Sequence, residues 1–260
     1  MDALVGINGC SMRPPIDPGC FPTGLHYPGI AHLLRVAAIG VPEEFTVDAE
    51  VSRLPIVAID TETTGRDPVT DRIVEVAAVL WDGTDISDRL SWLVDPGRPI
   101  PKEATDIHGI SDTDVAGKPT FSEILPELMD ALGGRVPLAY NAQFDRQFLT
   151  EEFGRSAVLE LRSVPAFRRN VEWLDPLVWV REVQSDEKSK SLGEVCQRLG
   201  IPLANAHRAT DDAEAALKVL LAIMPDPRIP RTYAAFLQEQ RRLGRRQDEE
   251  RARWRRERGL

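Results

Sequence analysis

Apolar residues along the chain follow two different periods, and the two patterns succeed each other in a clear order. Short apolar or alternating runs, which are typical of strands, cover Ile56 to Asp60, Ile73 to Trp81, Ile86 to Val94 and Val136 to Tyr140. The second and third runs are joined by a turn that contains DGTD, which predicts a hairpin. Three strands are therefore expected before the first long helix.

Apolar residues at helical spacing follow these strands. The segments SEILPELMDALGG, AQFDRQFLTEEFG, SLGEVCQRLG and DDAEAALKVLLAIM each predict a helix, and the first of them has a glycine stop. An order of strands first and strand–helix units afterwards predicts an α/β protein with a mixed sheet flanked by helices. The hairpin would form an antiparallel edge on a partly parallel sheet.

The chain divides into three segments by composition. Residues 1–52 form an N-terminal extension that begins with several Pro and Gly turn signals and continues with the helically spaced IAHLLRVAAIG. Residues 53–225 carry all the strand and helix patterns of the α/β domain. Residues 226–260 form a charged, Arg-rich C-terminal tail, for which the sequence predicts either a helix or disorder.

Composition narrows the class of protein. The chain has 260 residues, of which 42% are hydrophobic, enough for one sizeable core, and it contains no apolar run long enough to cross a membrane. The start, MDALVGINGCSMRPP, lacks the pattern of a secretory signal, so we expect a cytoplasmic protein. Three cysteines form neither a disulfide framework nor a CxxC metal motif.

The net charge of −9 is unevenly distributed. The segment from Arg231 to Leu260 holds ten Arg and five acidic residues, so the preceding residues carry a net charge of about −14. An acidic body argues against binding of nucleic acid over the whole surface. It is compatible with a small site where metal ions neutralise a phosphate.

Two carboxylates stand at the end of the first predicted strand, in the sequence IVAIDTETTG. Because side chains alternate across a strand, Asp60 and Glu62 share one face and emerge together at its carboxyl end. Two ionised carboxylates this close repel each other unless a proton or a cation lies between them, and oxygen ligands suit a divalent cation. The alternative is that both are solvated turn residues.

Further acidic residues occur in two helical segments. Asp145 lies near the start of one predicted helix, where it is either a ligand or a first-turn carboxylate favoured by the helix dipole, and Asn141 is most simply the N-cap. In AHRATDDAEAALKVL, Asp211 has the spacing of a capping-box residue, which puts Asp212 in the first turn. His207 falls in the loop ahead and is either an exposed loop residue or a neighbour of Asp212 in one cavity.

The motifs DTETTG, NAQFD and HRATDDA, in this order, resemble the three motifs of the DEDD 3'-5' exonucleases, in the branch whose third motif carries a histidine. The stretch DPGRPIPKEATDIHGISD also resembles the region between the first two motifs in the proofreading (epsilon) subunit of bacterial DNA polymerase III and its freestanding relatives. The likeness covers residues 53–225 and implies a ribonuclease H-like exonuclease fold for that domain.

The resemblance also implies roles for individual residues. Four acids would ligate two divalent metal ions, Mg²⁺ or Mn²⁺, and take part in catalysis: Asp60, Glu62, Asp145 and Asp212. His207 would be the general base, because an imidazole with a pKa near about 6.5 accepts a proton at neutral pH. Substrate contacts would come from Thr63, Thr64 and Asn141, while His108 is expected to organise its loop.

The function implied is a 3'-5' exonuclease, with DNA preferred over RNA, acting on single-stranded nucleic acid or 3' ends. The direction of cleavage depends on the resemblance alone. The N-terminal extension and the tail are candidate sites for a protein partner, and the arginines of the tail either assist binding to the nucleic-acid backbone or form a solvated helix. The alternatives are an inactive binding module on the same fold, or an RNA-directed or nucleotide-directed phosphodiesterase.

Overall fold

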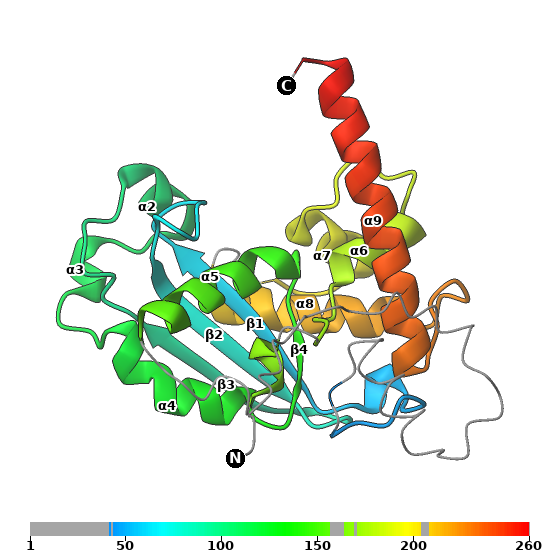
Figure 1. The fold of residues 1–260 in the computed structure, drawn as a ribbon, viewed down its shortest axis with the longest axis horizontal. Coiled ribbons are helices and arrows are strands. Elements are labelled where there is room, and N and C mark those ends of the chain that lie inside the picture. Colours follow the sequence, from blue (N-terminus) through cyan, green and yellow to red (C-terminus); the bar gives the residue numbers. More distant parts are fainter. Residues whose placement is uncertain (1–41, 43, 157–163, 169–170, 204–207, 260) are drawn as a thin grey trace, which may run out of the picture.

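The computed structural model describes residues 42, 44–156, 164–168, 171–203 and 208–259, and its centre is a four-stranded mixed sheet (Figure 1). The strands are β1 (Ile56–Thr63), β2 (Ile73–Trp81), β3 (Ile86–Leu93) and β4 (Val136–Leu138), in the order β3-β2-β1-β4. β2 pairs antiparallel with both β1 and β3, whereas β4 runs parallel to β1. The predicted antiparallel hairpin edge on a mixed sheet is confirmed.

Helices connect and flank these strands. Their bounds are α2 (Lys102–His108), α3 (Asp112–Val115), α4 (Phe121–Leu132), α5 (Ala142–Arg155), α6 (Pro176–Val183), α7 (Leu192–Leu199), α8 (Ala209–Ile223) and α9 (Tyr233–Glu257), with short 3-10 turns η1 (Val51–Arg53) and η3 (Pro165–Phe167). Among the described residues, no helix is both long and apolar enough to span a membrane.

The two faces of the sheet are covered by different helices (Figure 1). Val57 and Ile59 of β1 point into a core that includes residues of α4 and α5. Ile56 and Ala58 point the other way, into a core built with α6, α8 and α9. Asp60 and Glu62 share the parity of Ile56 and Ala58, and this places their side chains on the face that α8 covers.

Capping differs from the sequence prediction at two helix starts. α8 begins at Ala209 with Arg208 as N-cap, so the predicted capping box from Asp211 to Glu214 is wrong. Glu214 instead forms ion pairs with Arg89 and Lys218. Arg89 belongs to β3 and Lys218 to the next turn of α8, so neither partner is part of a helix cap.

Asn141 occupies the N-cap position of α5, as predicted, but its side chain makes no capping hydrogen bond. Its backbone adopts the left-handed conformation, with φ of 71°, which few residues other than glycine accept readily. The Asp175 carboxylate accepts hydrogen bonds from the N–H groups of Asn141 (3.0 Å) and Ala142 (3.1 Å). A side chain far along the chain therefore caps α5.

The segments that flank the domain in sequence are joined to it and to each other. The N–H of Val51 donates to the carbonyl of Arg231 (2.9 Å), and the N–H of Tyr233 donates to that of Ala49 (2.8 Å). Phe236 and Leu237 are fully buried in the core beneath α8. The first half of α9 is thus part of the core, so deleting the whole tail would expose apolar surface and would not isolate the role of its arginines.

A buried ion pair fastens α5 to the start of β2. Glu152, 1% exposed, accepts hydrogen bonds from Arg72 Nε (2.6 Å) and from Arg72 at its second oxygen (3.0 Å). The Ile73 N–H donates to the same carboxylate (3.3 Å). Because α5 also carries Asp145, this pair helps to fix the position of Asp145 relative to the sheet.

Glu152→Ala is therefore expected to lower the free energy of unfolding by about 3 kcal/mol, since it leaves Arg72 and a buried N–H without their acceptor. The value lies at the low end for a broken buried pair because the Arg72 side chain is 31% exposed to water. Urea denaturation measures it, with the neighbouring substitution Glu151→Ala as control. A loss below about 1 kcal/mol, equal to that of the control, contradicts the assignment.

Candidate metal centre

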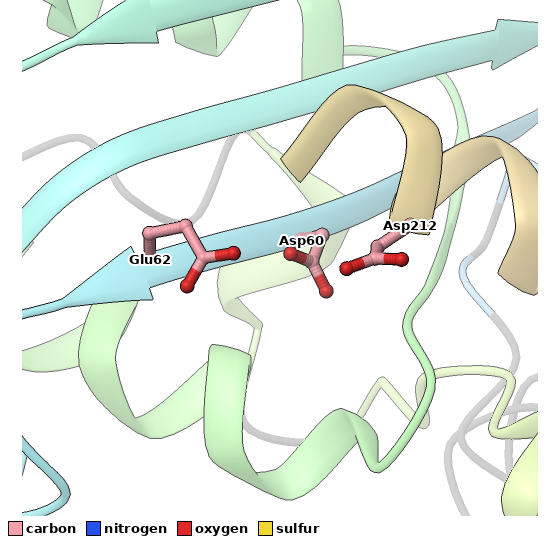
Figure 2. Close-up of side chains that lie close together, drawn as sticks. All are labelled: Asp60, Glu62 and Asp212. Carbon is pink, nitrogen blue, oxygen red and sulfur yellow. The ribbon is translucent and has the colours of Figure 1, made fainter. Parts of the chain in front are cut away.

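Three of the four predicted acidic ligands converge in the structure. Asp60 and Glu62 extend from β1, and Asp212 extends from the first turn of α8, which lies across that strand (Figure 2). One carboxylate oxygen of each lies within 4.8 Å of the others. Figure 2 shows the Asp60 carboxylate between the other two. The donors are all carboxylate oxygens, the ligand type that Mg²⁺ and Mn²⁺ prefer.

The electrostatics of this cluster favour a cation. Burial raises the pKa of Asp60 well above its usual value, and the charges of Asp145 and Glu62 raise it further. Burial, followed by the charges of Asp212 and Glu75, raises the pKa of Glu62 to about 8. Burial and repulsion both favour the uncharged form of these carboxyl groups, and a divalent ion would offset both by neutralising their charge.

Asp145 lies beside this cluster but outside the group of three. It is 3% exposed, and its Oδ1 accepts a hydrogen bond from the Thr61 hydroxyl at 2.8 Å. Burial raises the pKa of Asp145 to about 7, although the bond from Thr61 acts in the opposite direction. The charge of Asp145 also raises the pKa of Asp60, so the two carboxylates interact electrostatically.

His207 lies outside the described residues. The next residue, Arg208, forms an ion pair with Glu75 at 3.5 Å. Glu75 stands opposite Glu62 in the register between β1 and β2. The start of α8 is therefore attached to the strand that borders the carboxylate cluster.

A cavity of about 630 Å³ opens next to the cluster. Its lining includes the predicted contact residues Thr63, Thr64 and Asn141 together with Glu62 and Phe144. The hydroxyls of both threonines are used locally: that of Thr63 donates to the Gly65 carbonyl (2.5 Å), and that of Thr64 accepts from the Arg72 N–H (3.0 Å). Together with the Thr64 N–H, which donates to the Arg72 carbonyl (2.8 Å), these bonds shape the turn after β1.

His108 also lines this cavity, at the end of α2. It is buried, and its Nδ1 accepts a hydrogen bond from the Ile110 N–H at 3.0 Å. Gly109, between them, adopts the left-handed conformation that ends the helix. The bond supports the expectation that His108 organises this turn.

Glu75 is a buried acid that the sequence motifs did not indicate. It is 1% exposed, its Oε1 accepts a hydrogen bond from the Ser91 hydroxyl at 2.7 Å, and its Oε2 has no partner among the described residues. Its charge raises the pKa values of both Asp60 and Glu62. The available signal was a single glutamate within the apolar strand IVEVAAVLW.

The sequence is similar to known exonuclease and polymerase sequences. Residues 57–220, well over half of the chain, match the model of the protein family described as Exonuclease. Among curated relatives, the chain is 35% identical over 164 residues to the DNA polymerase III PolC-type of Clostridium perfringens. It is 32% identical over 174 residues to the protein of the same name from Thermotoga maritima.

These alignments cover 63% and 67% of this chain but only 11% and 12% of the two relatives. The chain therefore corresponds to a small part of those polymerase proteins. The residues matched to the family, 57–220, include Asp60, Glu62 and Asp212.

Solved structures show the same fold. Escherichia coli exonuclease I, in complex with a dT13 oligonucleotide, superposes with a TM-score of 0.57 at 20% identity, covering 66% of this chain and 41% of that one. Exonuclease X, in complex with a 5'-overhanging duplex DNA, superposes with a TM-score of 0.52 at 27% identity, covering 70% and 99%. The expected ribonuclease H-like exonuclease fold is confirmed.

Proposed function

Because this chain belongs to the exonuclease family, we propose that it is a metal-dependent 3'-5' exonuclease that prefers DNA to RNA. The observation that carries the proposal is the convergence of Asp60, Glu62 and Asp212 beside a cavity of about 630 Å³. The cavity combines carboxylates with the apolar side chains of Ile107 and Phe144, which suits a nucleotide base attached to a metal-bound phosphate.

In the proposed mechanism four residues would hold two divalent ions, Mg²⁺ or Mn²⁺: Asp60, Glu62, Asp145 and Asp212. Such ions, when bound, stabilise charge on the phosphoryl oxygens and lower the pKa of the attacking water. His207 accepts the proton of that water as general base. Thr63 and Thr64 hold the terminal nucleotide, largely through their backbone, and Asn141 contacts the phosphate side.

The proposed substrate is a single-stranded nucleic acid or a free 3' end. Support comes from the complexes of exonuclease I with an oligonucleotide and of exonuclease X with an overhanging duplex. The relatives named DNA polymerase III support DNA over RNA. A cytoplasmic location, and a protein partner bound through residues 1–52 or the tail, also belong to the proposal.

The test is degradation of a 5'-labelled single-stranded DNA and an RNA of the same sequence, with Mg²⁺, with Mn²⁺ and with chelator. We expect a ladder that shortens from the 3' end, requires metal and forms faster on DNA. Free nucleotides are tested in parallel. Hydrolysis of nucleotides alone would replace the proposal with a nucleotide-directed phosphodiesterase, and metal-independent binding without any cleavage would replace it with an inactive binding module.

A further inference from the structure

A second cavity, of about 750 Å³, lies between α5, α6 and α9. Arginines from all three helices line it: Arg146 of α5, Arg181 of α6, and Arg241, Arg245 and Arg251 of α9. The last three lie on one side of a helix whose C-terminal turns extend beyond the rest of the fold (Figure 1). A basic cavity is thus built into a chain whose net charge is −9.

The acidic residues of this cavity already serve structural roles. Asp175 accepts hydrogen bonds from three backbone N–H groups, at the starts of α5 and α6. Glu172 accepts from Arg241 Nε at 3.1 Å, and Asp248 forms an ion pair with Arg251 at 2.5 Å. Among the described residues that line the cavity, five are arginines and three are carboxylates, so the described lining has more positive than negative charges.

Burial and mutual repulsion make this charge costly without an anion. Burial lowers the pKa of the Arg146 guanidinium. Burial also lowers that of Arg181, and the nearby charge of Arg251 lowers it further. Arg245, by contrast, is exposed and forms no ion pair among the described residues. A phosphate group would offset the repulsion between these guanidinium groups.

The arginine-lined cavity and the cavity at the metal centre share one lining residue. Asn141, at the start of α5, lines both. Next along α5, Gln143 faces the arginine-lined cavity and Phe144 faces the metal-centre cavity. A chain whose end lies at the carboxylates can therefore pass Asn141 and enter the space beside α9.

We propose that the arginine-lined cavity binds backbone phosphates of the single strand upstream of its 3'-terminal nucleotide. This inference rests on the proposed exonuclease function. The metal centre would hold the terminal nucleotide, and the arginine-lined cavity would hold upstream phosphates whatever the base sequence of the strand. From Arg241 to Arg251, α9 extends over about 15 Å at 1.5 Å per residue, which is enough for more than one nucleotide. α9 lies beyond residues 57–220, so this part of the path is outside the region matched to the family.

The experiment compares two double variants of α9. Arg245→Ala with Arg251→Ala removes two cavity arginines, one of which pairs with Asp248. The matched control is Arg242→Ala with Arg253→Ala. It also removes two arginines, and one of them, Arg242, forms an ion pair with a residue three positions away, Glu239. The control residues do not line the cavity, and they share another helix face because they are three turns apart. Both double variants change the net charge equally.

Binding of a 5'-labelled 12-nucleotide DNA and of a trinucleotide is measured by fluorescence anisotropy with Mg²⁺ present, and each variant is made in a His207→Ala background so that hydrolysis is slow. We expect the cavity variant to lower affinity for the 12-mer by about tenfold relative to the control. The slope of log affinity against log salt should become shallower by about 1.4, or about 0.7 for each phosphate that an arginine no longer neutralises. The ratio of 12-mer to trinucleotide affinity should fall accordingly.

The outcomes separate this inference from the proposed function. If wild-type protein cleaves DNA but the cavity variant binds the 12-mer like the control, the inference is wrong and the exonuclease function stands. An equal loss for both oligonucleotides would also overturn it, because a strand path acts only on the longer one. If wild-type protein neither cleaves nor binds nucleic acid, both are wrong. Arg245→Glu should weaken 12-mer binding more than Arg245→Ala, and equal effects would contradict phosphate contact.

Discussion

Asp60→Asn is expected to lower the rate of hydrolysis by about a thousandfold, while raising the stability of the metal-free protein at pH 8. Loss of a metal ligand removes about 4 kcal/mol of transition-state stabilisation, which corresponds to that factor in rate. The gain in stability of the metal-free protein comes from the loss of a buried charge. Asparagine has nearly the same shape but no charge, so it removes both the burial of a charge and the repulsion with Asp145 and Glu62, which together raise the pKa of Asp60.

Metal-free stability should depend on pH in a definite direction. Burial raises the pKa of Glu62 to about 8 and that of Asp145 to about 7, and it raises that of Asp60 as well. In the unfolded chain these groups titrate near about pH 4. The folded state therefore binds more protons than the unfolded state between about pH 4 and 8, and metal-free stability falls as pH rises through this window.

Thermal melts in chelator at pH 5 and pH 8 measure this effect, with the exposed Asp130→Asn as control for loss of one carboxylate. Wild type and control should lose stability toward pH 8, and Asp60→Asn should lose less. Metal at about 100 times its Kd should raise the melting temperature of wild type by roughly 5–10 °C at pH 8, but by less at pH 5, where the ligands hold protons. An equal metal shift in Asp60→Asn would exclude Asp60 as a ligand.

His207→Ala is expected to reduce turnover by about a hundredfold to ten-thousandfold, the usual contribution of a general base. Metal-dependent binding of a nucleic-acid end should be retained, because the carboxylates that hold the ions are unchanged. Single-turnover rates across pH 5 to 8 distinguish the role from a structural one. The wild-type rate should fall below about pH 6.5 as the imidazole gains its proton, and the variant should lack this acidic limb.

Added imidazole provides the control for that experiment. Partial recovery of the rate in His207→Ala, without a change in metal affinity, would support proton transfer at this position. Turnover equal to that of wild type would remove His207 from the mechanism and leave the carboxylates as the supported part of the site.

The positions of Asp60, Glu62 and Asp212 followed largely from the sequence, because local periodicity fixes where a side chain points. The two-residue period of a strand places Asp60 and Glu62 on one face, and the apolar stripe of the last domain helix places Asp212 in its first turn. The β2–β3 hairpin was equally predictable from two apolar runs joined by a short polar turn.

Other features depend on contacts between distant segments, which no local period contains. Asn141 takes a left-handed backbone because Asp175, 34 residues away, accepts from its N–H. Glu75 is buried beside the cluster because the strand register sets it opposite Glu62. The composition of residues 226–260 indicated only a charged tail, whereas packing against α6 and pairing with the extension place α9 in the core.

Local sequence was sufficient for the places of the strands along the chain, for the shared face of Asp60 and Glu62 and for the first-turn position of Asp212, because these depend on neighbours within a few positions. Tertiary packing was needed to make the charged tail one wall of an arginine-lined cavity, which shares Asn141 with the cavity at the metal centre. Contacts between helices remote in sequence create that arrangement. The amphipathic pattern of α9 specifies only that one side is buried, without specifying its partner.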